Sequence, residues 1–182
     1  MIALQHRHEM CDSVDNIRIG GHYICRYNDL DELRDAYCKY CKSALESNRV
    51  VVLLPYYETT GQVEQYLTNV GIDIALHKRT HSLFILDSIG QFFGTDQDLL
   101  KFLSILDNGA VQSGKTGVSV IIGNDALMHF GEKQRVIEFE EQLHARTGLK
   151  NTTIICTYHE ERWQTFSEEN RQAIVSDHDG ML

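Results

Sequence analysis

The sequence has few basic residues, a single proline and no long apolar run. Its 17 lysines and arginines are outnumbered by 26 aspartates and glutamates, which gives a formal net charge of −9 at pH 7. This charge disfavours non-specific attraction to nucleic acids and to anionic membranes. No segment approaches the roughly 18 apolar residues of a membrane span, and no signal peptide is recognisable at the N-terminus. We therefore expect a cytoplasmic protein without direct nucleic-acid or membrane contacts.

The five cysteines do not indicate a disulfide framework. Their number is odd, and cysteines of intracellular proteins are usually reduced thiols. With 182 residues and 42% hydrophobic composition, the chain is long enough for one domain with a substantial core. We expect this domain over residues 21–182. Residues 1–20 have weak periodicity and are expected to form a partly ordered lead-in.

One strand–turn–helix segment organises the chain. Val50–Leu54 is an unbroken, mostly β-branched apolar run, which is typical of a strand buried on both faces. The following turn, Pro55–Thr60, occupies the place where a RecA-type ATPase has its glycine-rich phosphate loop, because the N–H groups of a helix N-terminus attract anions. Here the turn has no Gly-Lys-Thr and instead contains Tyr56, Tyr57 and Glu58.

Apolar runs alternate with helical patterns about five times. The expected strands are His22–Tyr27, Val50–Leu54, Ser82–Leu86, Gly117–Gly123 and Thr152–Tyr158. The expected helices begin after Asp29 and Thr59, at a cap formed by Thr95, and at Lys133, and a loop is expected over 87–94. This alternation predicts an α/β fold, a three-layer sandwich with a mostly parallel central sheet and right-handed crossovers.

Several short segments carry a family resemblance. The segment His22–Tyr27 opens the expected domain, and it resembles the His-Ile-Cys sequence with which the domains of one known family begin. Further matching segments are Ala44-Leu45-Glu46, Val50–Leu54, Leu67–Gly71, Gly71–Ile74, Ile137–Glu140 and Ile155–Tyr158. Their order and spacing resemble the MEDS family, the sensory domain named for methanogens, methylotrophs and the dichloromethane regulator. The resemblance covers about residues 21–182.

This resemblance implies a RecA/KaiC-like fold that has lost its nucleotide loop, in agreement with the Pro55–Thr60 turn. It also implies a domain that senses small molecules or relays a signal. Members of the family are commonly fused to a histidine kinase or to a DNA-binding helix-turn-helix. This sequence shows no such output domain, so we expect it to act on a separate signalling partner.

Aromatic and polar residues near the expected strand ends form the candidate ligand site. In open parallel sheets, ligands collect beyond the carboxyl ends of the strands. An aromatic and polar rim there suits a small, partly apolar ligand. The predicted ligand-binding residues are His22, Tyr27, Tyr56, Tyr57, Glu58, Cys156 and Tyr158. The alternative is that these tyrosines only hydrogen-bond across loops. Glu140 could reach into the same region, but Glu138, Glu140 and Glu141 are more simply interpreted as a solvated helix face.

Two patterns with known chemistry lack the structural context that they need. Gly109–Thr116 matches the phosphate-loop pattern, but a helix precedes it and a strand follows, which predicts a helix-to-strand turn with an exposed lysine. His22, Cys25, Cys38 and Cys41 have zinc-ligand chemistry. However, the first two point to opposite faces of a strand and the other two lie inside a helix. We therefore expect neither a metal nor a cofactor.

The sequence predicts a non-catalytic sensory domain that binds a small ligand or a protein partner and so regulates transcription or a kinase. No nucleophile motif and no pair of catalytic carboxylates stands out. Two alternatives stay open. One is a divergent nucleotide-binding ATPase that contacts phosphate through Lys115 and Thr116 or through another loop. The other is a ligand-free interaction module that docks on a KaiC-like ATPase or a histidine kinase. The oligomeric state also stays open, a homo-oligomer included.

Overall fold

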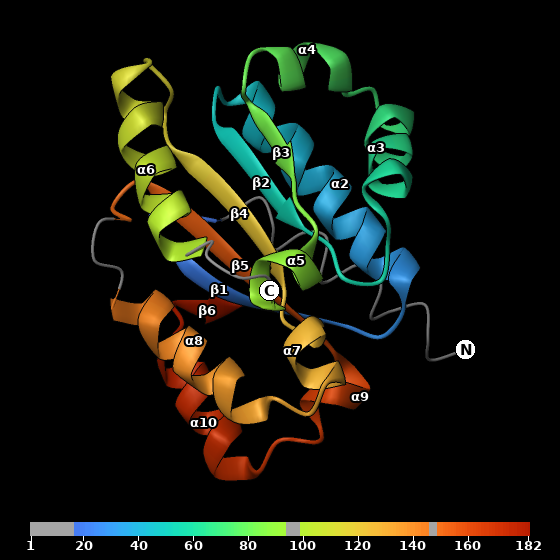
Figure 1. Cartoon of the computed structure of the whole chain (residues 1–182), viewed down its shortest axis with the longest axis vertical. Coiled ribbons are helices and arrows are strands. Elements are labelled where there is room, and N and C mark those ends of the chain that lie inside the picture. Colours follow the sequence, from blue (N-terminus) through green and yellow to red (C-terminus); the bar gives the residue numbers. More distant parts are fainter. Residues whose placement is uncertain (1–16, 94–98, 146–148) are drawn as a thin grey trace.

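The computed structural model describes residues 17–93, 99–145 and 149–182. The strands are β1 (His22–Tyr27), β2 (Val50–Leu54), β3 (Leu83–Ile85), β4 (Val118–Gly123), β5 (Thr152–His159) and β6 (Gly180–Met181). The helices are α2 (Leu30–Glu46), α3 (Thr60–Asn69), α4 (Ile74–Arg79), α5 (Ser88–Phe93), α6 (Leu99–Gln112), α7 (Asp125–His129), α8 (Lys133–Ala145), α9 (Glu160–Trp163) and α10 (Glu168–Ser176). Figure 1 shows their arrangement.

The six strands form one sheet in the order β3-β2-β4-β5-β1-β6. Every neighbouring pair in this sheet is parallel. The predicted α/β architecture is confirmed. Parallel strands need crossover connections, and buried parallel strands are apolar on both faces. All five residues of β2 and all six residues of β4 are accordingly buried.

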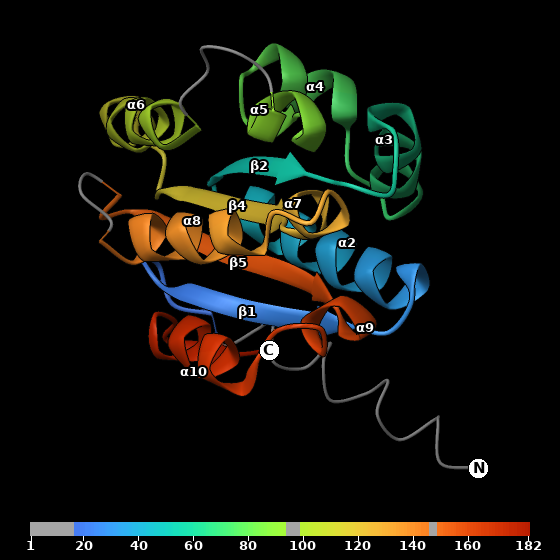
Figure 2. The ribbon, with the colours of Figure 1, turned by 60° about the horizontal axis from the view of Figure 1, so that its bottom comes forward.

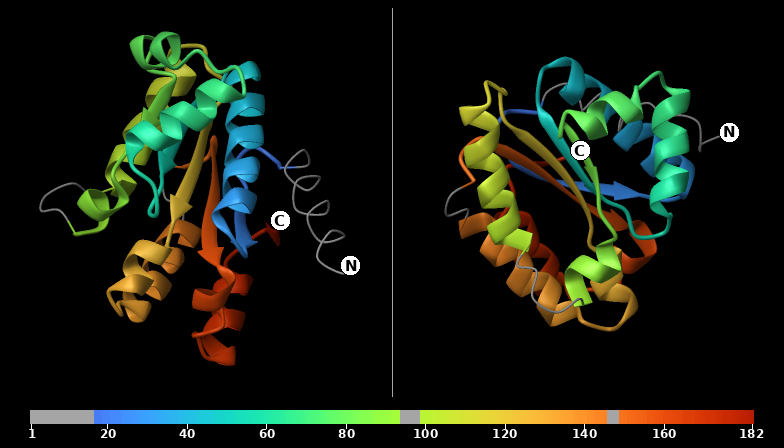
Figure 3. Two further views of the ribbon diagram at one scale, coloured as in Figure 1. Left: turned by 90° about the vertical axis from the view of Figure 1, so that its right-hand side faces the viewer. Right: turned by 45° about the horizontal axis from the view of Figure 1, so that its top comes forward.

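Helices cover both faces of the sheet, as predicted. One core lies between the sheet and α2 and α3, and a second core lies between the sheet and α6, α8 and α10. Figure 2 shows α2 and α8 on opposite sides of the strands. In the left view of Figure 3, the strands run between these two layers. The two faces of the sheet therefore offer two separate environments for polar side chains.

Cysteines fill part of the core on the α2 side. Cys25, Cys38 and Cys41 are buried there as free thiols, which agrees with the expected behaviour of cysteine as a small hydrophobe. His22 lies on the opposite face of the sheet, where its ring contacts Cys156. The four residues with zinc-ligand chemistry, His22, Cys25, Cys38 and Cys41, therefore do not form one site.

The N-terminus of α3 differs from a phosphate site. Thr59 Oγ1 accepts a hydrogen bond from Gln62 N at 3.3 Å, and Gln62 Oε1 accepts one from Thr59 N at 2.9 Å. This capping box uses N–H donors that a phosphate loop leaves available to an anion. Thr59 and Gln62 thus cap α3 at the position where a phosphate loop would bind an anion.

The GAVQSGKT segment is a helix-to-strand turn, as predicted. Gly109 lies inside α6, and Gly114 has a φ of 77° in the turn that follows. Lys115 Nζ donates to Asn48 Oδ1 at 3.0 Å, and Thr116 Oγ1 donates to Ser47 O at 2.7 Å. The turn precedes β4 and so lies at the amino ends of the strands.

Some local predictions differ from the structure. The loop expected over 87–94 contains helix α5, whose first N–H groups at Ile89 and Gly90 donate to the Asp87 carboxylate at 3.2 and 3.0 Å. Helices α7 and α9 are short and were not predicted. The expected cap at Thr95 and residues 1–16 of the expected lead-in lie outside the described residues.

Candidate functional site

The seven predicted ligand residues lie in two separate places, on opposite faces of the sheet. Side chains alternate between the two faces along a strand, so His22 and Tyr27 of β1 point in opposite directions. His22 lies on the α8 face and contacts Cys156 of β5. Tyr158, two residues beyond Cys156, shares that face. The remaining four residues line a hollow on the α2 face: Tyr27, Tyr56, Tyr57 and Glu58.

The hollow lies at the carboxyl ends of β2 and β4, next to the turn that leads from β2 to α3. Four tyrosines, one glutamate and one threonine supply its polar side-chain groups, and leucine, valine and isoleucine side chains supply most of the remaining surface. We call this site the tyrosine hollow, defined by Tyr27, Tyr37, Tyr56, Tyr57 and Glu58. An apolar lining with a few converging polar groups is the usual composition of a small-molecule site.

Glu58 joins the turn to α2. Its residue is 8% exposed, and both of its carboxylate oxygens have partners. Arg34 Nε donates to Oε1 at 2.8 Å, and Tyr37 Oη donates to Oε2 at 3.2 Å. Because an unpaired buried carboxylate is costly, these contacts fix the position of the turn.

Tyr27 lines the hollow and is bound to Asp125, which lies outside the lining. Tyr27 Oη donates to Asp125 Oδ2 at 2.6 Å, and the backbone N–H of His159 donates to the same carboxylate at 3.0 Å. Burial raises the pKa of Tyr27, and the charge of Asp125 raises it further. Burial also raises the pKa of Asp125, although the bonds from Tyr27 and His159 oppose that change. The phenol therefore stays protonated and acts as a donor.

Tyr56 and Tyr57 form the outer rim. Their rings meet edge to face with centroids 4.6 Å apart. Tyr56 also contacts the ring of His129, and Tyr57 contacts the ring of His159, at centroid distances of 5.7 and 6.5 Å. Tyr57 is 38% exposed, whereas Tyr27 is only 1% exposed. The rim is thus the accessible part of the hollow.

Gly123 allows the turn after β2 to approach the end of β4. A Cβ atom on this glycine would lie 3.1 Å from Leu54 O and 3.4 Å from the backbone N of Tyr56. The contact with Leu54 O is tight for a side-chain carbon, and the one with Tyr56 N lies at the lower limit of ordinary van der Waals contact. The sequence of β4 therefore contributes to the shape of the hollow through the absence of a side chain.

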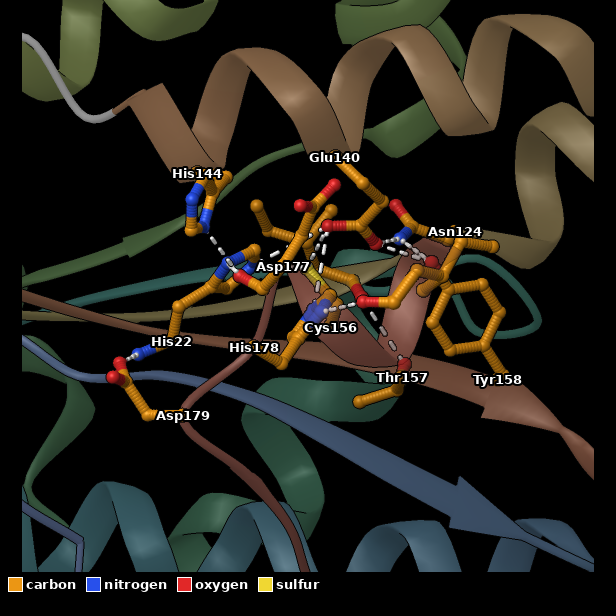
Figure 4. A network of polar contacts seen from close by, with 12 residues as sticks. His22, Asn124, Glu140, His144, Cys156, Thr157, Tyr158, Asp177, His178 and Asp179 are labelled. Carbon is orange, nitrogen blue, oxygen red and sulfur yellow. Dashed lines mark hydrogen bonds and ion pairs between the residues drawn. The ribbon is translucent and has the colours of Figure 1, made fainter. Parts of the chain in front are cut away.

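A second group of polar residues is enclosed on the α8 face (Figure 4). We call it the histidine cluster: His22, Glu140, Cys156 and His178. Its members come from β1, from α8, from β5 and from the connection between α10 and β6. The side chains of His22 and Glu140 are fully buried, that of His178 is 1% exposed, and Cys156 is fully buried.

The functional atoms of the cluster converge on one carboxylate oxygen. His22 Nε2 lies 3.2 Å from Glu140 Oε2, and His178 Nε2 lies 3.4 Å from it. Cys156 Sγ lies 3.4 Å from Glu140 Oε2 and 3.4 Å from His22 Nε2. The two imidazole rings stack with centroids 3.7 Å apart.

Asn124 and Tyr158 hold the other oxygen of Glu140. Asn124 Nδ2 donates to Oε1 at 2.5 Å, and the Tyr158 hydroxyl donates to the same oxygen. Burial favours the protonated form of Glu140, but the facing imidazoles of His178 and His22 outweigh burial and lower the pKa of Glu140. Glu140 is therefore a carboxylate.

Burial has the opposite consequence for two neighbours of Glu140. Burial and then the charge of Glu140 raise the pKa of Cys156 and of Tyr158 well above the ordinary values. Both groups consequently carry their protons next to the carboxylate.

The interpretation of Glu140 as part of a solvated helix face is wrong. Glu138 and Glu141 are exposed, but Glu140 shares the buried face of α8 with Val136 and Leu143. Residues four positions before and three positions after a helical residue lie on the same face of the helix as that residue. The spacing of Val136, Glu140 and Leu143 was therefore a usable signal that Glu140 is buried. His178 was missed because it belongs to no recognisable pattern in the sequence.

Comparisons with known proteins identify the family. The family model of the MEDS domain, described as the methanogen/methylotroph, DcmR sensory domain, matches residues 21–179. The chain belongs to the MEDS family. No curated protein sequence matches the chain. The resemblance stated from short segments is thus confirmed over nearly the whole domain.

Solved structures confirm the fold of this MEDS domain. One is the uncharacterized protein PH0321 of Pyrococcus horikoshii, in complex with an unknown peptide, with a TM-score of 0.69, 13% identity, and coverage of 93% of this chain and 81% of that chain. Another is the KaiC-like protein PH0186 of the hyperthermophilic archaeon Pyrococcus horikoshii OT3, with a TM-score of 0.62, 13% identity, and coverage of 91% and 71%. At this identity the likeness shows a KaiC-like, RecA-type fold.

The described part of the MEDS domain contains no helix that combines the length and the apolar character of a membrane span.

Proposed function

We propose that this MEDS domain is a non-catalytic sensor in which the tyrosine hollow binds a small, partly apolar ligand. The observation that carries the proposal is the Pro55–Thr60 turn. At the position of a phosphate loop, the turn places two tyrosines and a paired glutamate beside a mainly apolar hollow. The family, which is named as a sensory domain, supports the same role.

The charges of the hollow favour this ligand class over a nucleoside triphosphate. Glu58 and Asp125 bring two carboxylates to the carboxyl ends of the strands, and Arg34 is already bound to Glu58. Carboxylates repel phosphate groups, whereas tyrosine rings with buried hydroxyls suit a compact ligand that has an apolar body and one or two polar atoms.

Signal output would pass through the outer rim. Tyr56 and Tyr57 belong to the same turn as Glu58, so a ligand that changes their packing also changes the surface formed by this turn and α3. The ligand shifts the domain only if it prefers one arrangement of the rim over another. The output is a contact with a kinase or a transcription regulator.

A thermal-shift screen of the purified protein tests the proposal. One arm contains small metabolites and short apolar compounds, and another contains ATP with magnesium. A ligand at a hundredfold excess over its dissociation constant stabilises the folded state by about 2.7 kcal/mol. We expect a compound that raises the Tm of the wild type and of Ile105→Ala, an exposed control on α6, but not of Tyr57→Ala.

Three results would contradict the proposal. Equal shifts in wild type and Tyr57→Ala would place the ligand outside the tyrosine hollow. The absence of any shift would favour an interaction module without a ligand, which a peptide or protein partner would then stabilise. A shift with ATP alone would instead favour the nucleotide-binding alternative.

A further inference from the structure

We propose that the histidine cluster is a binding site for one divalent transition-metal ion of the zinc type, with His22, Glu140, Cys156 and His178 as ligands. This site is independent of the tyrosine hollow. It uses other residues, lies on the other face of the sheet, and takes a different class of ligand.

The distances between the four side chains fit a tetrahedral site. Zinc binds nitrogen and oxygen at about 2.0–2.2 Å and sulfur at about 2.3 Å, which places neighbouring ligand atoms roughly 3.3–3.7 Å apart. Four separations in the cluster are 3.2, 3.4, 3.4 and 3.4 Å. All four ligand atoms lie within 4.8 Å of one another. A small shift of the side chains therefore suffices to enclose an ion.

The backbone presents both imidazoles in the form that a metal requires. His22 Nδ1 lies 3.2 Å from Asp177 O, and His178 Nδ1 lies 2.6 Å from Ile174 O. A carbonyl oxygen only accepts hydrogen bonds, so each Nδ1 carries a proton. The Nε2 atoms of both rings then face Glu140 and Cys156, and an ion that displaces their protons would meet both lone pairs. Metal-binding histidines are commonly oriented by such a bond from the outer ring nitrogen.

The carboxylate is oriented in the same way. Asn124 and Tyr158 bind Oε1 of Glu140 and leave Oε2 to face the two histidines and Cys156. A carboxylate with one oxygen held by neighbours and the other directed at nitrogen and sulfur atoms is arranged as a monodentate ligand.

One atom of the cluster lacks a well-formed hydrogen bond. His178 Nε2 is buried and lies 3.4 Å from Glu140 Oε2, but it makes no hydrogen bond of ordinary geometry among the described residues. Buried polar atoms are nearly always paired, so an unsatisfied one needs an explanation. A metal ion at the centre of the cluster would accept the lone pair of this nitrogen.

The charges of the cluster also balance around a divalent ion. A glutamate carboxylate and a cysteine thiolate carry two negative charges, and two neutral imidazoles add none, so a divalent cation makes the buried site neutral. The stacked rings of His22 and His178 would repel each other if both were protonated. Binding would release the thiol proton of Cys156 and any proton shared by the rings.

The donor set selects the kind of metal. Nitrogen and sulfur ligands suit zinc and other borderline transition metals, whereas calcium and magnesium prefer all-oxygen sites. Four protein ligands close the coordination shell, which is typical of a structural rather than a catalytic zinc site. The ion would tie the connection between α10 and β6, which contains His178, to β1, β5 and α8.

The test uses cobalt as a spectroscopic substitute for zinc. The full chain is unfolded in denaturant with a chelator and a thiol reductant, and is then refolded with and without Co²⁺, because a buried site needs an opening for the ion to enter. We expect one bound Co²⁺ per chain, measured by elemental analysis, with thiolate-to-cobalt charge-transfer absorption and the visible bands of a tetrahedral ion. The bound ion should also raise the Tm.

Three variants separate the cluster from other binding. Cys156→Ser should abolish the charge-transfer absorption, and His178→Ala should weaken Co²⁺ binding by more than about tenfold. His144→Ala is the matched control, because His144 contacts the same Asp177 carbonyl oxygen but is not a proposed ligand. It should bind as the wild type does. Circular dichroism checks that each variant is folded.

Three results would overturn the proposal. One is the absence of bound Co²⁺ in refolded wild-type protein. Another is a bound ion without thiolate absorption. The third is equal binding by wild type and His178→Ala. The wild-type spectrum decides the question even if Cys156→Ser fails to fold.

Discussion

Asn124 and Asp125 are neighbours in the chain, yet each serves a different site. Asn124 Nδ2 donates to Glu140 of the histidine cluster at 2.5 Å, and Asp125 accepts a hydrogen bond from Tyr27 of the tyrosine hollow at 2.6 Å. Both residues lie directly beyond the carboxyl end of β4. The two candidate sites are therefore separate in chemistry but joined through one short segment of backbone at the edge of the sheet where ligands usually bind.

Replacing Tyr27 by phenylalanine should destabilise the protein. The change removes the hydroxyl that donates to the buried carboxylate of Asp125 and leaves that carboxylate with the backbone N–H of His159. The expected cost is about 1–3 kcal/mol in the free energy of unfolding. Denaturant titration measures it.

The control for Tyr27→Phe is Tyr66→Phe. The guanidinium of Arg34 lies over the ring of Tyr66, 4.6 Å from its centroid, and phenylalanine keeps that ring. Equal losses of unfolding free energy in the two variants would show that the buried hydroxyl of Tyr27 contributes no more to stability than the partly exposed hydroxyl of Tyr66.

Replacing Glu140 by glutamine should also be costly, even in the presence of a chelator. The carboxylate accepts hydrogen bonds from Asn124, Tyr158 and Cys156, and an amide would direct its NH₂ group at one or more of these donors. We expect a loss of about 1–3 kcal/mol in the free energy of unfolding.

Glu138→Gln is the matched control for Glu140→Gln, because Glu138 lies on the exposed face of the same helix. Its effect should stay within about 0.5 kcal/mol. Similar effects of the two substitutions on urea unfolding would restore the interpretation of Glu140 as part of a solvated face.

The fold could be predicted from the sequence because its strands have strong local signals. Val50–Leu54 is apolar throughout and flanked by helical patterns, and it forms β2 with the predicted bounds. Short elements lack such signals. Strand β6 has two residues and exists because Asp179 N and Leu182 N donate to carbonyl oxygens of β1. This pairing depends on tertiary structure.

The tyrosine hollow was partly accessible to sequence reasoning, whereas the histidine cluster was accessible only as separate residues, without their arrangement. Tyr56, Tyr57 and Glu58 follow a recognisable strand, so their place at its carboxyl end could be inferred. The cluster depends on the register of β1 against β5, in which His22 pairs with Ile154 and therefore shares a face with Cys156. Sequence periodicity does not determine the register between strands that are distant in the chain.

Two glycine-to-alanine substitutions should have opposite effects. Alanine at Gly123 places a Cβ atom 3.1 Å from Leu54 O, so the turn after β2 must move and stability should fall by about 1–3 kcal/mol. Alanine at Gly109, inside α6, meets no atom within 4 Å and should raise stability by about 0.5–1 kcal/mol. Thermal unfolding of both variants measures the difference. If Gly123→Ala leaves the stability unchanged, the end of β4 does not constrain the shape of the hollow.

Replacing Lys115 by alanine should leave the protein almost unchanged, despite the phosphate-loop pattern around it. Its ammonium group donates to Asn48 Oδ1 on the surface, and exposed contacts of this kind contribute little, so the stability should change by less than about 0.5 kcal/mol. Lys42→Ala, which removes an exposed lysine that donates to Val70 O, is the control. ATP with magnesium should affect the Tm of both variants and of the wild type equally. A shift in the wild type that disappears only in Lys115→Ala would show that this turn binds phosphate, although it precedes a strand and lacks a helix N-terminus behind its glycines.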